Sequence, residues 1–289
     1  PLAAAALATV GLALAAGGPW VPAGPVPPGT PYLGIDYFVL DLLKSSAVFV
    51  TLERLFPLER TQPVFREAWQ TDLAWFALNH AGVGAPLLVV NAIAHAGAGA
   101  IGWAPLQALT GSLPMPVAVL ACLVVADLVQ YAVHRACHEV PWLWRFHAIH
   151  HSVRTMDWLA GSRLHVVEVI VTRSAVLAVL LAAGFDKAAM DIAIVAIGVQ
   201  AVFVHSNLRV RFGPLEAVWA TPRWHHWHHA SDEVALDRNY AVNFPWIDRL
   251  FGTAVPASAG ERPRAYGLHG EAVPDGLVAQ LRHPFARRR

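Results

Sequence analysis

Long apolar runs with almost no charges are the feature that most limits how this chain can fold. In the clearest of them, Leu113–Val133, the single charged residue is Asp127. A helix needs roughly 20 mostly apolar residues to cross a bilayer. Only 14% of the 289 residues are charged, whereas about a quarter are charged in soluble domains. The composition therefore disfavours a soluble monomer, a disordered chain and a nucleic-acid-binding protein.

The apolar runs predict an all-α fold, namely an integral membrane helical bundle of about four to six spans with a cytosolic helical cap. The candidate spans are Leu2–Gly18, Tyr37–Phe56, Asp72–Gly102, Leu113–Val133, Val166–Phe185 and Ala188–Val204. The first of these is short, so it is read either as a span or as the apolar part of a cleaved signal. Asp186 and Lys187 separate the last two runs and predict a helical hairpin. Arginines follow the runs that end at residues 133 and 204, which places the polar stretches 135–163 and 207–289 on the cytoplasmic side.

Eleven of the 15 histidines lie between His134 and His229, in three clusters and two single positions. The clusters read HRACH, HAIHH and HHWHH. Residues three and four apart share one face of a helix, so each cluster can direct two or three imidazoles at one point. The positions with this spacing are His134 and His138, then His147, His150 and His151, then His225, His228 and His229. His226 breaks the spacing and is expected outside the ligand set.

So many imidazoles gathered near membrane boundaries predict a metal site. Without a metal, protonating several of them together would cost Coulomb repulsion in a poorly hydrated place. Neutral imidazole is a good ligand for zinc, copper, iron and nickel. The clustered histidines, together with His165 and His205, exceed the needs of one tetrahedral zinc and suit two metal ions with open positions. The spacing alone does not select the metal.

Four polar residues near the clusters are candidates for orienting the ligating imidazoles through the other ring nitrogen. They are Asp127, Glu168, Asn207 and Asn239. Asp127 lies two helical turns before His134, and a carboxylate inside a span is costly enough to indicate a role. Glu168 follows His165 by one helical turn and is expected to hold it. The two asparagines are weaker candidates, since asparagine is also common at caps and turns.

The ordered motifs HRACH, WRFHAIHHS, FVHSNLR, TPRWHHWHHA and NYAVNFPWIDRLFGT resemble those of the fatty acid hydroxylase/sterol desaturase superfamily. The resemblance covers about Ala118–Thr253 and implies an integral membrane, non-haem di-iron oxygenase of lipids. Carried over position by position, it implies as metal ligands His134, His138, His147, His150, His151, His165, His205, His225, His228 and His229. Val166 stands where many relatives have proline, which weakens the assignment of His165.

The resemblance also implies the reaction and its cofactors. Two iron ions and O₂ would hydroxylate or desaturate an aliphatic C–H bond of a membrane lipid, and zinc can replace the iron in purified samples. The electrons would come from an external donor of the cytochrome b5, ferredoxin or rubredoxin type. No catalytic residue is expected beyond the metal ligands. The chain would divide into N-terminal hydrophobic membrane segments at 1–112, a fatty acid hydroxylase/sterol desaturase-like catalytic domain at 113–255 and a basic C-terminal tail at 256–289.

Two other functions use similar ligands. A membrane zinc-dependent hydrolase or isomerase needs one open zinc and a carboxylate base, as in HExxH. The sequence HEVPW at His138 lacks the second histidine of that motif. A non-enzymatic metal-binding membrane protein, such as a transporter, needs ligands spread along a path through the spans, whereas these clusters follow the spans. Hydroxylation and desaturation begin with the same hydrogen abstraction, so the motifs do not choose between them.

Overall fold

The computed structural model describes residues 35–289 except 82–83, 257–258, 261, 271 and 287–289. The predicted first span, Leu2–Gly18, lies outside the described residues. Within them the regular structure is helical, and the extended pairing is limited to the isolated bridges Pro57–Leu208 and Ala230–Tyr266. The all-α prediction is confirmed. The helices are α2 (Ile35–Leu55), α3 (Trp69–Ala81), α4 (Gly84–Ile101), α5 (Ala104–Gly111), α6 (Met115–Glu139), α7 (Pro141–His151), α8 (Val166–Ala183), α9 (Lys187–His205), α10 (Pro222–His228), α11 (Pro245–Phe251) and α12 (Leu277–Arg282).

Three of these helices, α6, α8 and α9, are long and apolar enough to cross a membrane. A fourth span results if Leu88–Ile101 and Ala104–Gly111, which meet at 114°, form one broken span. The described part of the chain therefore gives three or four candidate spans, against about four to six predicted for the whole chain. The other predicted spans fall short because α2 carries several charged residues and α3 has only 13 residues.

The predicted hairpin between residues 166 and 204 is present. α8 ends before Gly184, which has a left-handed backbone (φ 79°), and a Cβ there would meet the side chain of Gln107 at 2.7 Å. Glycine is therefore required at this turn. α9 begins after Asp186, whose carboxylate accepts hydrogen bonds from the backbone N–H groups of Ala188 and Ala189. Such an N-cap satisfies donors that the first turn of a helix leaves unpaired.

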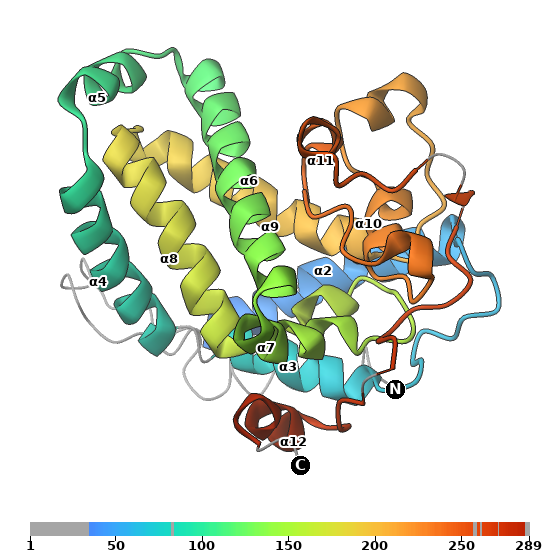
Figure 1. Ribbon diagram of the computed structural model, residues 1–289. Coiled ribbons are helices and arrows are strands. Elements are labelled where there is room, and N and C mark those ends of the chain that lie inside the picture. Colours follow the sequence, from blue (N-terminus) through green and yellow to red (C-terminus); the bar gives the residue numbers. More distant parts are fainter. Residues whose placement is uncertain (1–34, 82–83, 257–258, 261, 271, 287–289) are drawn as a thin grey trace.

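Small side chains allow the candidate spans to pack closely. α6 contacts both α8 and α9, and α4 lies along α8 (Figure 1). The core between α6 and α9 contains Cys122, Ala126, Ala189 and Ala193, all almost completely buried. In a membrane, where apolar side chains gain little by leaving lipid, close approach of small residues is a main source of helix association. The division predicted near residue 112 stays a prediction, and packing continues across it through α4 and α8.

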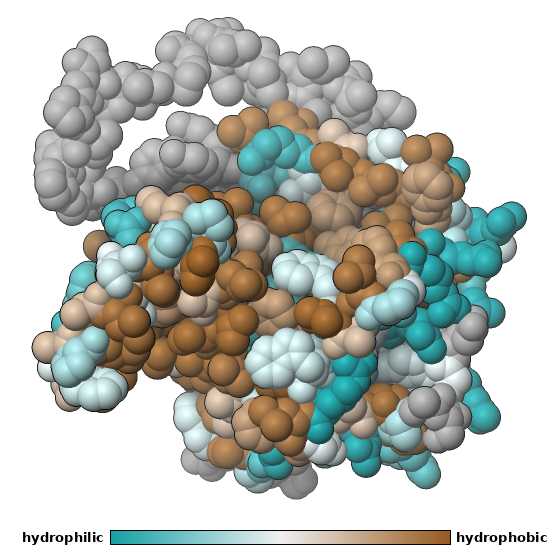
Figure 2. Space-filling model, turned by 90° about the horizontal axis from the view of Figure 1, so that it is seen from above, coloured by the Kyte–Doolittle hydropathy of each residue, from teal (hydrophilic) through white to brown (hydrophobic). Residues whose placement is uncertain are grey.

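Large apolar side chains cover much of the outer surface of these helices. On α9 alone, Ile192, Val195 and Val199 are at least half exposed, and Leu120 is equally exposed on α6. Figure 2 shows hydrophobic side chains across a large part of one face, with hydrophilic ones gathered toward one side. A continuous apolar surface of this kind marks an interaction surface, and for apolar helices of this length that surface faces lipid. The chain is a membrane protein.

Candidate metal centre

Nine imidazoles from the three clusters and from His205 converge in two groups. The first group is His134, His138, His147, His151 and His228, and the second is His150, His205, His225 and His229. Within each group one nitrogen from every ring lies within 4.8 Å of the others. No other residue type of the metal-ligating kind enters either group among the described residues. Two all-histidine sites are therefore present side by side.

Four helices deliver these rings, and their termini place the rings at one end of the bundle. α6 contributes His134 and His138 from its last two turns, and α9 contributes its last residue, His205. The short helices α7 and α10 begin at proline, which is well suited to the first position of a helix, and they carry the other two clusters. The α7 cluster divides between the groups, because His147 and His151 belong to the first and His150 to the second.

Outer hydrogen bonds fix the orientation of most of the rings. In four of them Nδ1 faces a backbone carbonyl oxygen at 2.6–3.2 Å. The pairs are His134 with Tyr240, His150 with Arg163, His205 with Ala201, and His228 with Arg238. A carbonyl oxygen only accepts, so Nδ1 carries the proton in each ring. In the neutral ring Nε2 then presents a bare lone pair to the centre of the group.

These lone pairs point at one another, which is the strongest sign of a metal. The Nε2 atoms of His150 and His205 lie 3.2 Å apart, although both rings have their proton on Nδ1. Burial lowers the pKa of His150 well below its ordinary value, so a second proton does not relieve the contact. Nε2 of His138 and of His228 are buried without any hydrogen-bond partner. A cation bound between the rings satisfies all of these atoms, and the residues therefore fit metal ions.

Two carboxylates also contact the rings. Oε1 of Glu168 on α8 lies 2.8 Å from Nδ1 of His147, and Oδ1 of Asp237 lies 3.1 Å from Nδ1 of His138. Each carboxylate accepts the Nδ1 proton and leaves Nε2 free for a metal. Glu168 thus holds a different histidine from the one expected, His165. Asp237 was not predicted. It sits in a loop with a left-handed backbone (φ 56°), where no helical spacing reveals its position.

His165 lies outside both groups, so the geometry does not support its prediction as a ligand. Its Nδ1 accepts a hydrogen bond from the backbone N–H of Val167 at 3.2 Å, which makes it the N-cap of α8. Its Nε2 lies 3.3 Å from the carbonyl oxygen of Leu281 and donates to it. Both ring nitrogens are therefore used. The sequence predicts a metal ligand at this position, whereas in the structure the residue caps α8.

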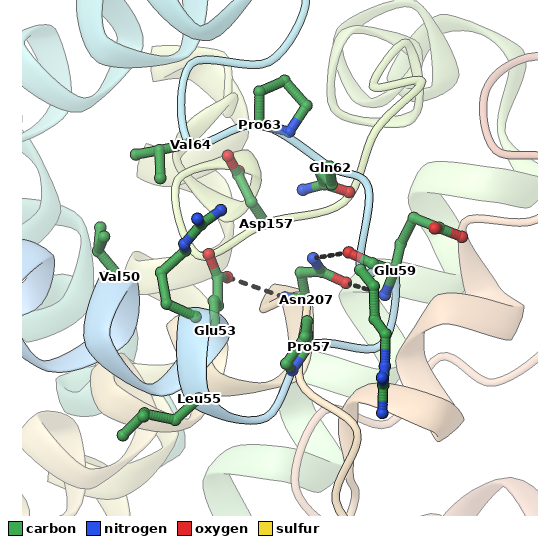
Figure 3. Close-up of a pocket in the computed structure, with 12 residues that line it drawn as sticks. Val50, Glu53, Leu55, Pro57, Glu59, Gln62, Pro63, Val64, Asp157 and Asn207 are labelled. Atoms are coloured by element: carbon green, nitrogen blue, oxygen red, sulfur yellow. Dashed lines mark hydrogen bonds between the residues drawn. The ribbon is translucent and has the colours of Figure 1, made fainter.

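Three of the four residues proposed to orient ligands contact loops instead of imidazoles. Asp127, fully buried in α6, accepts hydrogen bonds from the backbone N–H groups of Asn243 and Phe244. Asn207 bonds both the N–H and the C=O of Glu59, and Figure 3 shows it between Glu59 and Glu53. The side chain of Asn239 bonds the backbone of Trp224 and Val255. Asp127 on α6 and Asn239, bonded to α10, thus tie two helices that carry clusters to neighbouring segments, and the hydrogen bonds of the three residues go to groups other than imidazoles.

His226 lies outside both groups, as expected from its spacing. Its Nε2 is 3.3 Å and 3.1 Å from the carbonyl oxygens of His205 and Ser206, so Nε2 donates to them. Its Nδ1 accepts from the hydroxyl of Tyr266 at 3.0 Å. Burial lowers the pKa of His226 to about 4, which keeps the ring neutral. His226 therefore joins α10 to the end of α9, directly beside the second group.

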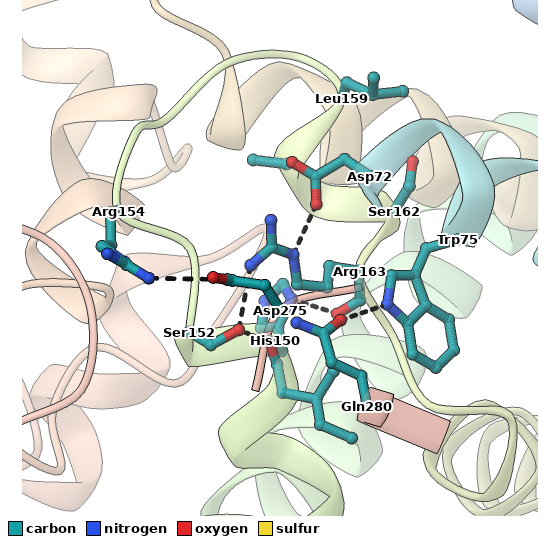
Figure 4. Close-up of polar contacts among 12 residues, drawn as sticks. Asp72, Trp75, His150, Ser152, Arg154, Leu159, Ser162, Arg163, Asp275 and Gln280 are labelled. Carbon is teal, nitrogen blue, oxygen red and sulfur yellow. Dashed lines mark hydrogen bonds and ion pairs between the residues drawn. The ribbon is translucent and has the colours of Figure 1, made fainter. Parts of the chain in front are cut away.

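A buried ion cluster, which the sequence did not reveal, supports the second group from α3. Arg163, whose carbonyl oxygen faces His150, directs its guanidinium at Asp72 and Ser152. Asp72 also pairs with Arg66, at 2.6 Å between Oδ2 and Nη2. Figure 4 shows Arg163 between Asp72 and His150. Arg66 continues the cluster to Asp157 through two hydrogen bonds of 2.6 and 2.9 Å. A segment well before the histidine clusters therefore helps to position one of their rings.

Comparison with known proteins identifies relatives of this chain. The fatty acid hydroxylase family model matches residues 119–253. An ornithine lipid hydroxylase from Rhizobium tropici is 30% identical over 267 residues, which cover 87% of this chain and 76% of that protein. An alkylglycerol monooxygenase from Caenorhabditis elegans is 30% identical over 150 residues, which cover 51% of this chain and 28% of that protein. Methylsterol monooxygenase 1 from Gallus gallus is 25% identical over 134 residues, which cover 46% and 44%. No solved structure matches.

Proposed function

This chain belongs to the fatty acid hydroxylase family, and we propose that it is a membrane-bound di-iron oxygenase that hydroxylates or desaturates an aliphatic C–H bond of a lipid. The relatives named above are lipid hydroxylases and monooxygenases, which are oxidoreductases. The observation that carries the proposal is the convergence of nine imidazole nitrogens in two adjacent groups. O₂ is the proposed co-substrate, and the electrons come from an external donor of the cytochrome b5, ferredoxin or rubredoxin type.

The target bond explains why the site needs redox metals. An aliphatic C–H bond has neither an acidic proton nor a leaving group, so acid–base groups cannot cleave it. A pair of redox-active metal ions supplies the missing chemistry by activating O₂. Histidine ligation is compatible with iron and zinc alike, but zinc has no redox chemistry. The oxygenase activity of the relatives therefore favours iron in this site.

The proposed ligands are the nine converging histidines, and His165 is left out. The protein prepares them by fixing Nδ1 against carbonyl oxygens and against the carboxylates of Glu168 and Asp237, so that most of the rings are held before a metal arrives. The site is also kept dry, since His147, His225 and His229 are at most 1% exposed. Exclusion of water protects reactive species from side reactions.

The position of the centre suits a substrate dissolved in the bilayer. His134 and His138 lie near the end of one candidate span, and His205 ends another. The centre is therefore close to a membrane boundary, where a lipid chain reaches it from the apolar side. Arginines follow both spans at this end, which supports a multi-pass topology with the histidine clusters on the cytoplasmic side. A soluble electron donor would then approach the polar cap.

The other two functions receive no support from the geometry. A zinc hydrolase needs a carboxylate beside the open metal position, whereas the carboxylates of Glu168 and Asp237 contact Nδ1 of His147 and His138, on the outer side of the rings. A transporter needs ligands along its spans, whereas all nine rings lie at one end of the bundle.

The proposed function is tested with His150→Ala, matched with His269→Ala in the exposed C-terminal part. Purified protein is supplied with a reductant, and O₂ uptake is recorded together with lipid mass spectra. We expect the wild type and His269→Ala to consume O₂ and to add one oxygen to, or remove two hydrogens from, a lipid. His150→Ala should lose this activity and part of its metal while the helical bundle stays folded. One tightly bound zinc with no O₂ uptake under reduction would contradict the proposal.

A further inference from the structure

A second site lies beside the metal centre, in a pocket of about 380 Å³ next to the end of α9. Its charged lining is made of arginines from three separate segments: Arg209 and Arg211 after α9, Arg223 on α10, and Arg262. Apolar residues and His226 complete the lining, which contains no acidic side chain among the described residues. The pocket is distinct from the metal centre because none of the nine converging histidines lines it.

Two carboxylates lie near these arginines. Glu216 lies 3.6 Å from Arg223, and Glu59 lies 3.8 Å from Arg262. The second pair is more than half exposed on both sides, and ion pairs of this kind contribute little. Four arginines from three segments thus line one small volume. Guanidinium binds phosphate and carboxylate oxygens in a planar, two-pronged geometry, so the pocket suits an anion.

The location of the pocket indicates that the anion belongs to a lipid. Arg209 follows the end of α9, a candidate span, by only four residues, which span roughly 14 Å at most. The surrounding surface exposes large apolar side chains, among them Phe56, Phe212, Leu215 and Val218. Arginines interleaved with exposed apolar residues are typical of segments that lie in the headgroup layer of a bilayer.

We propose that this pocket binds the anionic headgroup of a membrane lipid through its phosphate or carboxylate oxygens. The volume fits one small headgroup, since ligand pockets begin near 300 Å³. His226, in the pocket wall, is bonded to the carbonyl oxygens of His205 and Ser206, so a lipid held here lies next to the second metal group. Such a lipid site does not depend on the proposed function, because the bound lipid can be either the substrate or a neighbour in the bilayer.

The test measures lipid retention by native mass spectrometry on the full chain. Protein is purified with equal amounts of phosphatidylglycerol and phosphatidylcholine, and the ratio of the two retained lipids is determined. The variant Arg209→Gln/Arg211→Gln is compared with Lys44→Gln/Lys187→Gln, which loses the same charge at exposed positions outside the pocket. We expect the wild type and the lysine control to retain phosphatidylglycerol preferentially. The arginine variant should lose this preference by roughly fivefold for each arginine removed.

Further measurements separate the alternatives. Arg209→Lys/Arg211→Lys should keep most of the preference, and circular dichroism monitors folding in every variant. Displacement of phosphatidylglycerol by millimolar inorganic phosphate alone would overturn the lipid assignment in favour of a free-anion site. An unchanged preference for phosphatidylglycerol in the glutamine variant would also overturn the lipid assignment, and it would indicate that the arginines bind an acidic protein partner instead. Because the readout requires neither iron nor turnover, its failure is distinguishable from failure of the oxygenase proposal.

Discussion

Asp72→Asn tests whether the buried ion cluster on α3 supports the metal centre. The cluster contains two arginines, Arg66 and Arg163, and two carboxylates, Asp72 and Asp157, with each side chain at most 5% exposed. Asp72 is the member that contacts both arginines. Asparagine keeps its size but removes its charge, so the cluster changes from neutral to a net charge of one, with both guanidinium groups deprived of the same partner.

The expected cost follows from this burial. Removing one partner of a buried ion pair destabilises a protein by about 3–5 kcal/mol, because an uncompensated charge is left in a poorly polarisable place. That is a large part of a typical stability of about 5–15 kcal/mol. Since Arg163 also offers its carbonyl oxygen to His150, its displacement should release that ring. We therefore expect Asp72→Asn to lower both the unfolding free energy and the metal content of the folded fraction.

Denaturant unfolding in mild detergent measures the first effect, and elemental analysis of the folded fraction measures the second. Asp191→Asn is the matched control, because Asp191 pairs with Lys187 on the surface of α9 and both side chains are more than half exposed. Exposed pairs contribute about 0.2–1 kcal/mol, so the control should change little. Equal unfolding midpoints and equal metal contents for Asp72→Asn and Asp191→Asn would refute the reasoning.

Three further predictions concern the centre itself. Glu168→Ala removes the carboxylate that accepts a hydrogen bond from His147 and should weaken metal binding about 10- to 100-fold. Glu139→Ala, which removes an exposed surface ion pair with Arg135, should leave metal binding unchanged. Competition with a chelator measures metal binding in both variants. His165→Ala should keep the full metal content and cost about 1 kcal/mol through loss of the α8 cap, and a halved metal content would show that His165 is a ligand after all. Burial lowers the pKa of the histidine ligands in the α7 and α10 clusters well below their ordinary value. Below about pH 6.5 these histidines therefore bind protons in the unfolded chain but stay neutral in the folded chain, which favours unfolding. The free energy of unfolding and the amount of bound metal should both be highest above that pH and decrease as the pH falls toward 5. Dialysis at a series of pH values measures the retained metal, and retention that does not change with pH would contradict this.

The helical period explains what the sequence could predict. Spacings of three and four report residues on one face of one helix, so the clusters on α6, α7 and α10 were recognisable from their spacing alone. The hairpin of α8 and α9 was also recognisable, because Asp186 and Lys187 interrupt a long apolar run and mark a turn between two helices. The same pattern could not show that the α7 cluster divides between two metal groups.

Helical spacing could not predict contacts between residues that lie far apart in the chain. Asp237 reaches His138 from a loop with a left-handed backbone, and Asp72 supports His150 through Arg163. Neither relation has a fixed spacing along the chain. His165 shows the converse case, because a histidine near the others in sequence lies outside both groups, with one nitrogen capping α8 and the other bonded to a backbone carbonyl oxygen.

The most direct test of the central claim is the metal stoichiometry of the purified, folded protein. Nine imidazoles in two groups, with their Nε2 lone pairs directed inward, should bind two metal ions per chain, and in iron-replete cells these should be iron. Elemental analysis with protein quantification by amino-acid analysis gives the ratio. We predict two iron ions per chain, falling together on chelation. A folded protein that consumes O₂ with one metal ion per chain or none would contradict the account.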